Sequence, residues 1–192
     1  MSDGADSEAG RTVLIAEDQD GLAELYADIL GASYESRIAK DGEEALAQMN
    51  AEVDIVLLDR QMPKVHGDDV LAEFRARDFD QPVAMISAVY PEPEIVALDI
   101  DEYLLKPVRS AQLREVVRAL AARTECSKAL REYLALTSMK AVLEANMDTQ
   151  ALTSSDNYQR LQQQLADLRE TEDVATADLT ASGPAVGFRE YK

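Results

Sequence analysis

Five short apolar runs alternate with amphipathic segments over the first two thirds of the chain, and this alternation constrains the fold more than any other feature. Short unbroken apolar runs are typical of strands that are buried on both faces of a parallel sheet. The predicted strands are 12–16, 34–39, 55–59, 82–87 and 103–105, and the predicted helices are 21–30, 42–50, 68–77, 94–98 and 110–123. The alternation predicts an α/β fold, a doubly wound five-stranded parallel sheet with helices on both faces.

Residues at the predicted helix ends support this assignment. Asp20 is a residue type that caps helix N-termini, and Gly31 is typical of a C-terminal stop, so the first helix is expected between them. Between the fourth and fifth strands, Pro91 and Pro93 leave room for a helix of only about two turns.

Polar side chains stand where the predicted strands end. Glu17 and Asp18 follow the first strand, Asp59 ends the third, Ser87 ends the fourth and Lys106 follows the fifth. The carboxyl ends of parallel strands meet at one edge of a sheet, so these side chains are predicted to lie together. Three carboxylates at close range repel one another and require a hard cation such as Mg²⁺, which prefers oxygen ligands.

The chemistry of this set favours phosphoryl transfer to Asp59. A carboxylate is a competent nucleophile toward phosphorus and forms an acyl phosphate. Lys106 is a compact charge suited to a phosphoryl or carboxylate oxygen. Together with a metal ion, it would offset the charge that builds on the phosphoryl oxygens.

The spacing of these residues resembles the receiver domain of two-component response regulators. The likeness rests on Glu17-Asp18, Asp59 with Met62-Pro63, Ser87-Ala88, and Tyr103 three residues before Lys106-Pro107. It covers residues 11–123 and implies the flavodoxin-like receiver fold. Receivers often signal through their fourth helix, fifth strand and fifth helix, and the short fourth helix expected here departs from that pattern.

The resemblance also implies a role for each residue of the site. Asp59 would be the phosphoacceptor, charged by a sensor histidine kinase, and Mg²⁺ would be held by Glu17, Asp18, Asp59 and the backbone carbonyl of Gln61. Ser87 and Lys106 would bind the phosphoryl group, and Ser87 and Tyr103 would form the switch that responds to it.

Two more amphipathic helices are predicted after residue 123, at 125–148 and 156–172, and the capping-box spacing from Thr153 to Asp156 marks the start of the second. They are expected to form an antiparallel hairpin, closed within one chain or completed by a second chain in a homodimer. Three leucines of the second helix at heptad spacing would pack on apolar residues of the first. These are Leu161, Leu165 and Leu168, facing Leu136, Val142 or Leu143, and Met147.

The chain is thus expected to divide into four segments. They are a disordered N-terminus (1–10), the α/β domain (11–123), the hairpin (124–173) and a flexible tail (174–192). The α/β domain and the hairpin are expected to fold independently, each with its own core.

The stretch Arg131–Glu144 resembles the HalX domain that is attached to receivers in haloarchaea. The likeness does not define what this domain does. Residues 125–192 are net acidic and contain no helix-turn-helix or basic stripe. Contact with a downstream protein partner or self-association is therefore favoured over DNA binding by a transcriptional regulator.

The formal net charge of −18, with 6 lysines against 13 arginines, indicates an acidic surface. Adaptation to high salt is favoured over repulsion of nucleic acid as its cause. No apolar run approaches the ~20 residues of a membrane span, and Met1–Gly10 lacks the pattern of a signal peptide. A single cysteine, Cys126, excludes an internal disulfide. A halophilic, cytoplasmic protein without a membrane segment is predicted.

Two alternatives share the acidic site. A Mg²⁺-dependent phosphohydrolase with an aspartyl-phosphate intermediate would use Asp59, but hydrolases of the haloacid dehalogenase type need a second Asp where this chain has Gln61. A pseudo-receiver that serves only as a scaffold would not need the complete acidic set. His66 lies in a polar loop and is interpreted as a solvated residue rather than a phosphorylated histidine. A regulator that is not an enzyme is predicted.

Overall fold

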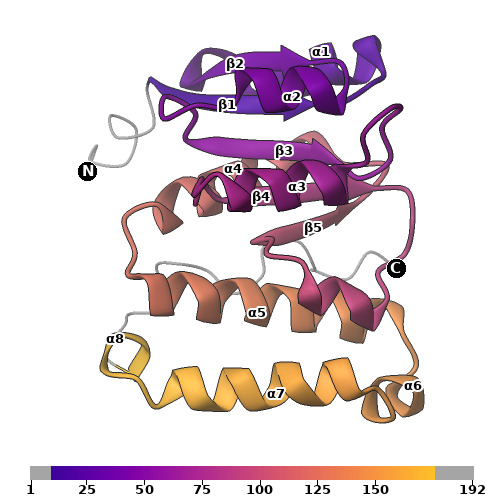
Figure 1. The fold of residues 1–192 in the computed structure, drawn as a ribbon, viewed down its shortest axis with the longest axis vertical. Coiled ribbons are helices and arrows are strands. Elements are labelled where there is room, and N and C mark those ends of the chain that lie inside the picture. The colour runs from indigo at the N-terminus through magenta and orange to yellow at the C-terminus, as the bar shows by residue number, and fades with distance from the viewer. Residues whose placement is uncertain (1–9, 176–192) are drawn as a thin grey trace.

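The computed structural model describes residues 10–175, and its strands form one parallel sheet (Figure 1). The strands are β1 (Arg11–Ala16), β2 (Tyr34–Ala39), β3 (Ile55–Asp59), β4 (Val83–Ser87) and β5 (Glu102–Leu105). Their order is β2-β1-β3-β4-β5, with parallel pairing throughout. The predicted doubly wound sheet is confirmed. The predictions made for residues 1–9 and 176–192 lie outside the described residues.

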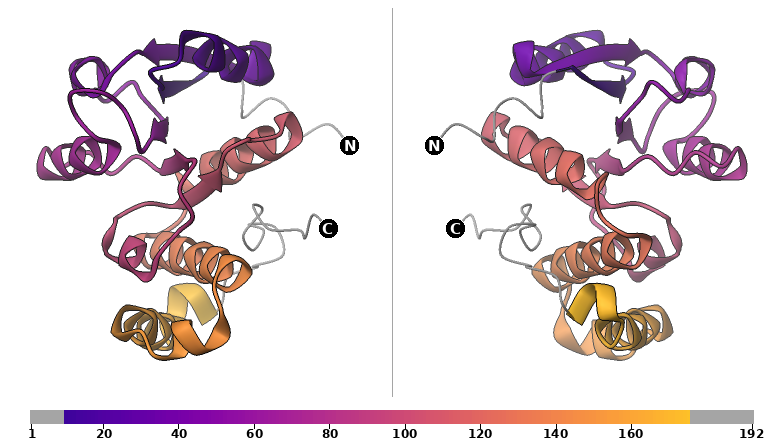
Figure 2. Two further views of the ribbon diagram at one scale, coloured as in Figure 1. Left: turned by 90° about the vertical axis from the view of Figure 1, so that its right-hand side faces the viewer. Right: turned by 90° about the vertical axis from the view of Figure 1, so that its left-hand side faces the viewer.

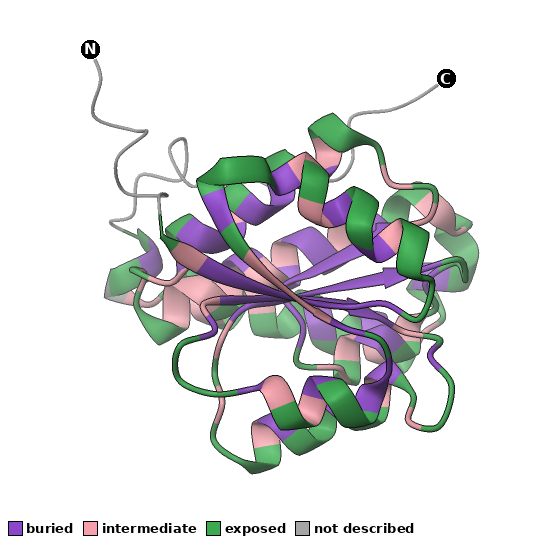
Figure 3. Ribbon diagram, turned by 90° about the horizontal axis from the view of Figure 1, so that it is seen from above, coloured by how far each residue is buried: buried purple, intermediate pink, exposed green. Residues whose placement is uncertain are grey.

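Helices cover both faces of the sheet, and Figure 3 shows the buried strands between them. They are α1 (Asp20–Leu30), α2 (Gly42–Gln48), α3 (Gly67–Ala76), the 3-10 helix η2 (Pro93–Ala97) and α4 (Ser110–Arg123), with a 3-10 turn η1 (Gly31–Ser33) after α1. Val13 and Ile15 of β1 face α1 and α4. Leu14 faces the opposite side, with α2, α3 and η2. This alternation gives the sheet a separate apolar layer on each face.

The remaining helices are α5 (Lys128–Asn146), α6 (Thr149–Thr153), α7 (Asp156–Arg169) and α8 (Glu172–Ala175). Helix α5 lies alongside β5, the last strand of the sheet, and α7 lies beyond α5 (Figures 1 and 2). An edge strand carries unpaired N–H and C=O groups, and a helix placed over the edge protects them. Helix α5 therefore shields the β5 edge. In the described part of the chain, no helix is long and apolar enough to cross a membrane.

The expectation that the hairpin has a core of its own is wrong, and its independent folding stays a prediction. Leu136 and Met139 of α5 and Leu161 of α7 belong to the same apolar core as Val83 and Tyr103 of the sheet. The physical reason is the short η2, which leaves apolar surface at the β5 end of the sheet that α5 and α7 cover. The core on the α1 and α4 face of the sheet is buried by the receiver alone, whereas the core on the other face is shared by both parts.

The predicted seam between the two long helices is confirmed. Leu161 is buried, and Leu165 and Leu168 are partly buried against the core that contains Leu136 and Val142. Because this stripe is covered within one chain, a second chain is not needed to bury it. A homodimer stays a prediction.

Two predicted caps are wrong. Gln19 is the N-cap of α1 and makes no side-chain cap bond, while Asp20 lies in the first turn and pairs with Lys40 at 2.9 Å. At α7 the N-cap is Ser155, whose side chain accepts from the backbone N–H of Tyr158. Thr153 instead ends α6, a short helix that lies between the two predicted long helices. Several neighbouring residues have capping side chains, so the position where α6 ends decides which of them caps α7.

Candidate functional site

Strands β1, β3 and β5 end at one edge of the sheet, and this edge gathers the predicted acids. Glu17 directly follows β1 and is 1% exposed, Asp59 ends β3 and is 4% exposed, and Asp18 is exposed. One carboxylate oxygen from each of the three lies within 4.8 Å of the others. The structure therefore brings together all three acids that the sequence singled out.

Lys106 reaches into this acidic group from the end of β5. Its Nζ donates to Glu17 Oε2 and to Asp59 Oδ2, both at 2.8 Å. Burial opposes the charged form of Lys106, but its hydrogen bonds to Asp59 and Glu17 outweigh burial and raise its pKa. Burial also raises the pKa of Glu17. The hydrogen bond from Lys106 opposes this rise, and the nearby charge of Asp59 adds to it. One ammonium cannot neutralise two carboxylates, so the group keeps an excess of negative charge.

The loop after β3 holds the other oxygen of Asp59. The backbone N–H of Gln61 donates to Asp59 Oδ1 at 3.0 Å. The Arg60 side chain turns away and binds Asp68 through Nε and Nη2, both at 3.0 Å. Asp59 is thus oriented by one backbone donor and one ammonium group.

Gly67 is a residue of this site that sequence reasoning missed. A Cβ atom there would lie 2.4 Å from the carbonyl oxygen of Asp59, which leaves no space for a side chain. The Gly67 N–H donates to the carbonyl of Arg60 at 2.9 Å and closes the loop. A glycine directly before the helix predicted to begin at residue 68, a position where a close backbone approach requires glycine, was the available signal.

Tyr26 of α1 was also missed. Its hydroxyl is buried and has no hydrogen-bond partner in the described part of the chain. Burial raises the pKa of Tyr26, and the charges of Glu17 and Asp59 raise it further. In the sequence, Tyr26 looked like an ordinary core residue of the first helix.

Ser87 and Tyr103 meet at the loop that follows β4. The Ser87 Oγ accepts from the backbone N–H of Val89 at 3.0 Å, and the Tyr103 hydroxyl donates to the carbonyl of Val89 at 2.8 Å. Tyr103 is 1% exposed, so its ring points inward. Both side chains therefore fix the same short segment next to Asp59. His66 is the exposed N-cap of α3 and makes no side-chain cap bond.

The residues present fit a magnesium ion. Carboxylate oxygens are the ligands that Mg²⁺ prefers, and the ion usually keeps several waters. Glu17 and Asp59 supply buried oxygens and Asp18 an exposed one, which leaves a solvent-facing side for such waters.

Comparison with known families agrees with this geometry. The family model of the response regulator receiver domain matches residues 13–118, more than half of the 192-residue chain. The model of the HalX domain matches residues 122–183. The chain therefore belongs to the response regulator receiver family and carries a HalX domain after its receiver.

Relatives with assigned names are regulators. A putative transcriptional regulator of Haloferax volcanii is 39% identical over 168 residues, which are 87% of this chain and 29% of that protein. The transcriptional regulatory protein CpxR of Klebsiella pneumoniae is 34% identical over 153 residues, which are 73% of this chain and 66% of that protein. The chain spans less than two thirds of the length of both relatives.

Solved structures match the receiver part. The receiver domain of the Francisella response regulator 1452 is 28% identical with a TM-score of 0.55, covering 60% of this chain and 99% of that one. The response regulator protein TrrA of Thermotoga maritima, in complex with Mg²⁺ and BeF, is 31% identical with a TM-score of 0.50. It covers 57% of this chain and 98% of that one.

Proposed function

We propose that this chain is a cytoplasmic response regulator in which Asp59 accepts a phosphoryl group from a sensor histidine kinase. The observation that carries the proposal is the buried Asp59 carboxylate, held by Lys106 at 2.8 Å beside two further acids. A cluster of this composition, at the carboxyl ends of parallel strands, matches the chemistry of phosphoryl transfer.

In the proposed reaction, a carboxylate oxygen of Asp59 forms a bond to phosphorus while the bond from phosphorus to the imidazole nitrogen of the donor breaks. The electron pair of that bond stays on the imidazole. Lys106 Nζ, already bound to Asp59, would donate to a phosphoryl oxygen of the product, and the Ser87 hydroxyl would turn from Val89 to a second one. Mg²⁺, held by Glu17, Asp18, Asp59 and the Gln61 carbonyl, would offset negative charge on the phosphoryl oxygens.

Tyr103 would respond to this change together with Ser87. Both bind Val89, so a turn of the Ser87 hydroxyl alters the segment that the Tyr103 hydroxyl holds. The HalX helices would then carry the signal to a downstream protein. The exposed residues of α7 support protein contact rather than DNA binding, because its two arginines, Arg160 and Arg169, are separated by neutral glutamines and by Asp167 and form no basic stripe.

Phosphorylation of Asp59 is tested with acetyl phosphate as a small-molecule donor. The wild type should show a phosphate adduct by intact mass in the presence of Mg²⁺, and Asp59→Asn should show none, because an amide is not a nucleophile of this kind. Asp69→Asn is the matched control, since Asp69 is an exposed acid in the first turn of α3. An adduct of equal yield in Asp59→Asn, or in the wild type with the metal chelated, would refute the proposal.

A further inference from the structure

Strand β5 joins the candidate site to the HalX helices within five residues. Lys106, directly after the strand, contacts Glu17 and Asp59. Tyr103 holds the loop that follows β4. Glu102, at the start of the strand, makes its hydrogen bonds to α4 and α5. Because β5 pairs with β4 from Glu102 to Leu105, these residues are carried on one rigid element.

The contacts of Glu102 form a buried polar network at the junction. Glu102, Arg123 of α4 and Ser138 of α5 are 2%, 0% and 1% exposed. Arg123 Nη2 donates to Glu102 Oε1 at 2.6 Å and Arg123 Nη1 to the carbonyl of Asp101 at 2.9 Å. The Ser138 hydroxyl donates to the other carboxylate oxygen of Glu102. Desolvated charges of this kind depend on keeping every partner in place.

Ser138 gives this network its link to the HalX domain. In α5 it is the buried polar residue, surrounded in the sequence by buried apolar residues such as Leu136, Met139 and Val142. The apolar contacts tolerate small shifts of the helix, whereas a hydroxyl bonded to a carboxylate fixes one register. The position of α5 is therefore tied to the position of β5.

A second connection runs from Tyr103 to α7. The Tyr103 hydroxyl holds the Val89 carbonyl, and the chain continues from Val89 into η2. Helix η2 packs against α7, and its Ile95 is buried in the core that contains Leu161. Both HalX helices thus contact segments that are connected to the candidate site, α5 on β5 and α7 on η2.

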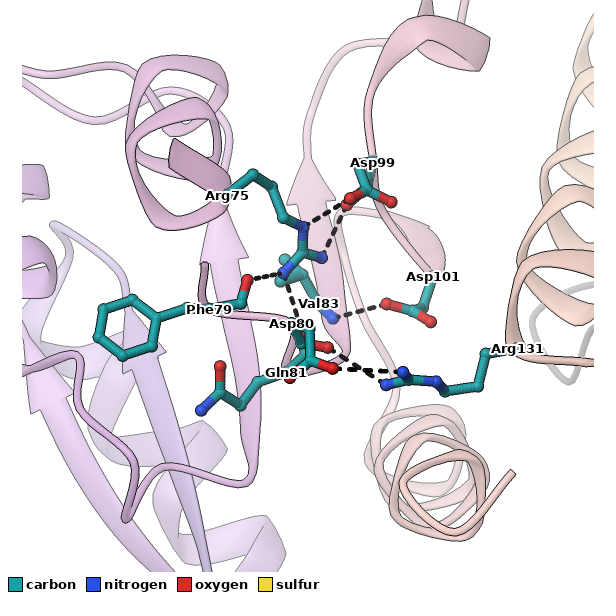
Figure 4. Close-up of polar contacts among 8 residues, drawn as sticks. All are labelled: Arg75, Phe79, Asp80, Gln81, Val83, Asp99, Asp101 and Arg131. Atoms are coloured by element: carbon teal, nitrogen blue, oxygen red, sulfur yellow. Dashed lines mark hydrogen bonds and ion pairs between the residues drawn. The ribbon is translucent and has the colours of Figure 1, made fainter. Parts of the chain in front are cut away.

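The perimeter of the junction is less tightly packed than its centre. Figure 4 shows Arg75 of α3 bound to the carbonyls of Phe79 and Gln81, at 2.9 and 3.0 Å, and Arg131 of α5 reaching Asp80 at 3.3 Å. Asp80 is 82% exposed, and exposed ion pairs contribute little. A groove of about 400 Å³ lies beside these residues. The perimeter therefore permits movement that the Glu102 network restrains.

We propose that Glu102, through Ser138, couples the phosphorylation state of Asp59 to the docking of α5 and α7 on the receiver. The coupling rests on the phosphorylation proposed above. A phosphoryl group on Asp59 gives Lys106 new acceptor oxygens, so the end of β5 that carries Lys106 shifts. The network is complete while Lys106 binds Asp59 directly. A displacement of β5 lengthens the hydrogen bonds of the Glu102 network. Phosphorylation therefore loosens the docking of α5 and α7 on the receiver.

The test is amide hydrogen exchange of the full chain in high salt with Mg²⁺, before and after treatment with acetyl phosphate. In the wild type, phosphorylation should lower the protection of amides in α5 and α7. Ser138→Ala should lower it by about tenfold to a hundredfold before treatment, the equilibrium ratio of one hydrogen bond to a charged group. Phosphorylation of Ser138→Ala should then lower the protection of amides in α5 and α7 by less than it does in the wild type.

Two further variants control this measurement. Thr137→Ala removes the neighbouring hydroxyl, whose described bond stays within α5, to Tyr133, and it should respond as the wild type does. Glu102→Gln keeps the shape of the side chain and should repeat the sign seen with Ser138→Ala.

Intact mass, measured on the same samples, separates the two proposals. A phosphate adduct with unchanged protection of α5 and α7 overturns the coupling and leaves the proposed function standing. A response of wild-type size in both Ser138→Ala and Glu102→Gln overturns the role of the network. The absence of an adduct in the wild type overturns the proposed function and the coupling with it.

Discussion

The two ends of β5 carry two clusters of buried charge, and only one of them includes a charged group that is exposed to solvent. At the carboxyl end, Lys106 faces the two buried acids Glu17 and Asp59, and a third acid, Asp18, is exposed. At the other end, Glu102 is paired with Arg123, with both side chains 1% exposed, and a second buried acid, Asp101, accepts from the backbone N–H of Val83. Both acids at this end are buried and have donors within the protein. An open cluster with excess negative charge is completed by a cation or a ligand.

Burial acts in the same direction on the acids of both clusters, but the hydrogen-bond partners of these acids differ. Burial raises the pKa of Glu17 and also that of Glu102. At the junction, the charge of Arg123 opposes this effect at Glu102 and also at the buried acid Asp101, and the Ser138 hydroxyl opposes it at Glu102. At the site, Lys106 is shared between Glu17 and Asp59. Burial alone therefore does not distinguish a functional acid from a structural one. The exposure and the donors of the whole cluster do: Asp18 of the site is exposed, whereas both acids of the junction are buried and accept hydrogen bonds from the protein.

The largest effect is expected at the buried pair of Glu102 and Arg123. Arg123→Ala leaves Glu102 buried without its cation, and the free energy of unfolding should fall by about 3–5 kcal/mol. Urea unfolding in high salt, followed by circular dichroism, measures it. The control is Arg77→Ala, whose pair with Glu73 is nearly half exposed and should contribute about 0–1 kcal/mol. Equal losses in the two variants would contradict a structural role for this buried pair.

The apolar part of the junction comes next. Leu161 of α7 is 0% exposed, and Leu161→Ala should lower the free energy of unfolding by about 2–5 kcal/mol. Because the receiver and the HalX helices share one core, unfolding should remain a single transition at a lower urea concentration. Gln162→Ala, on the exposed side of α7, should change little. Two separate transitions, with phosphorylation of Asp59 retained in the first, would show that the parts are independent after all.

The open cluster should respond to metal. Mg²⁺ at a hundredfold excess over its Kd should stabilise the chain by about 2.7 kcal/mol, seen as a rise in Tm. Asp18→Ala should lose this rise, while Glu24→Ala, an exposed acid of α1, should keep it.

Lys106→Ala should bind the metal but lose the response to phosphorylation, because the ammonium serves the phosphoryl group. Loss of metal affinity in Lys106→Ala as large as in Asp18→Ala would reverse these roles.

The smallest effect is a dependence on pH without divalent cations. Burial raises the pKa of Glu17 from 4.5, so the folded chain favours its protonated form. The stability that this provides is present below pH 4.5 and is lost as the pH rises through the raised pKa. Glu17→Gln should therefore gain stability relative to the wild type across that window. The effect is small because the hydrogen bond from Lys106 opposes burial.

Unfolding of the wild type and Glu17→Gln, compared at several pH values above 4.5, gives the sign of the difference. If the wild type instead becomes more stable than Glu17→Gln as the pH rises, the hydrogen bond from Lys106 outweighs the effect of burial on Glu17. Added Mg²⁺ should reverse the sign, because the ionised carboxylate is then the favoured form.

Local patterns in the sequence were sufficient for the sheet and for most of the site. Apolar runs specify buried strands, and their alternation with helices specifies parallel pairing, so the strand ends had to meet at one edge. Glu17, Asp18, Asp59 and Lys106 could be grouped on that basis alone, without knowledge of any side-chain contact. Gly67 and Tyr26 were missed because their roles arise from how closely α3 and α1 approach the site.

Only the tertiary structure decided how the two domains join. Glu102 is a charged residue in a short strand and Ser138 a small polar residue in a long helix, and neither stands out in the sequence. Their contact spans 36 positions and exists because α5 covers the β5 edge. The same holds for the start of α7, where capping residues crowd together and the fold of α6 selects Ser155. Periodicity describes one element at a time, whereas burial of a polar residue depends on which other element packs over it.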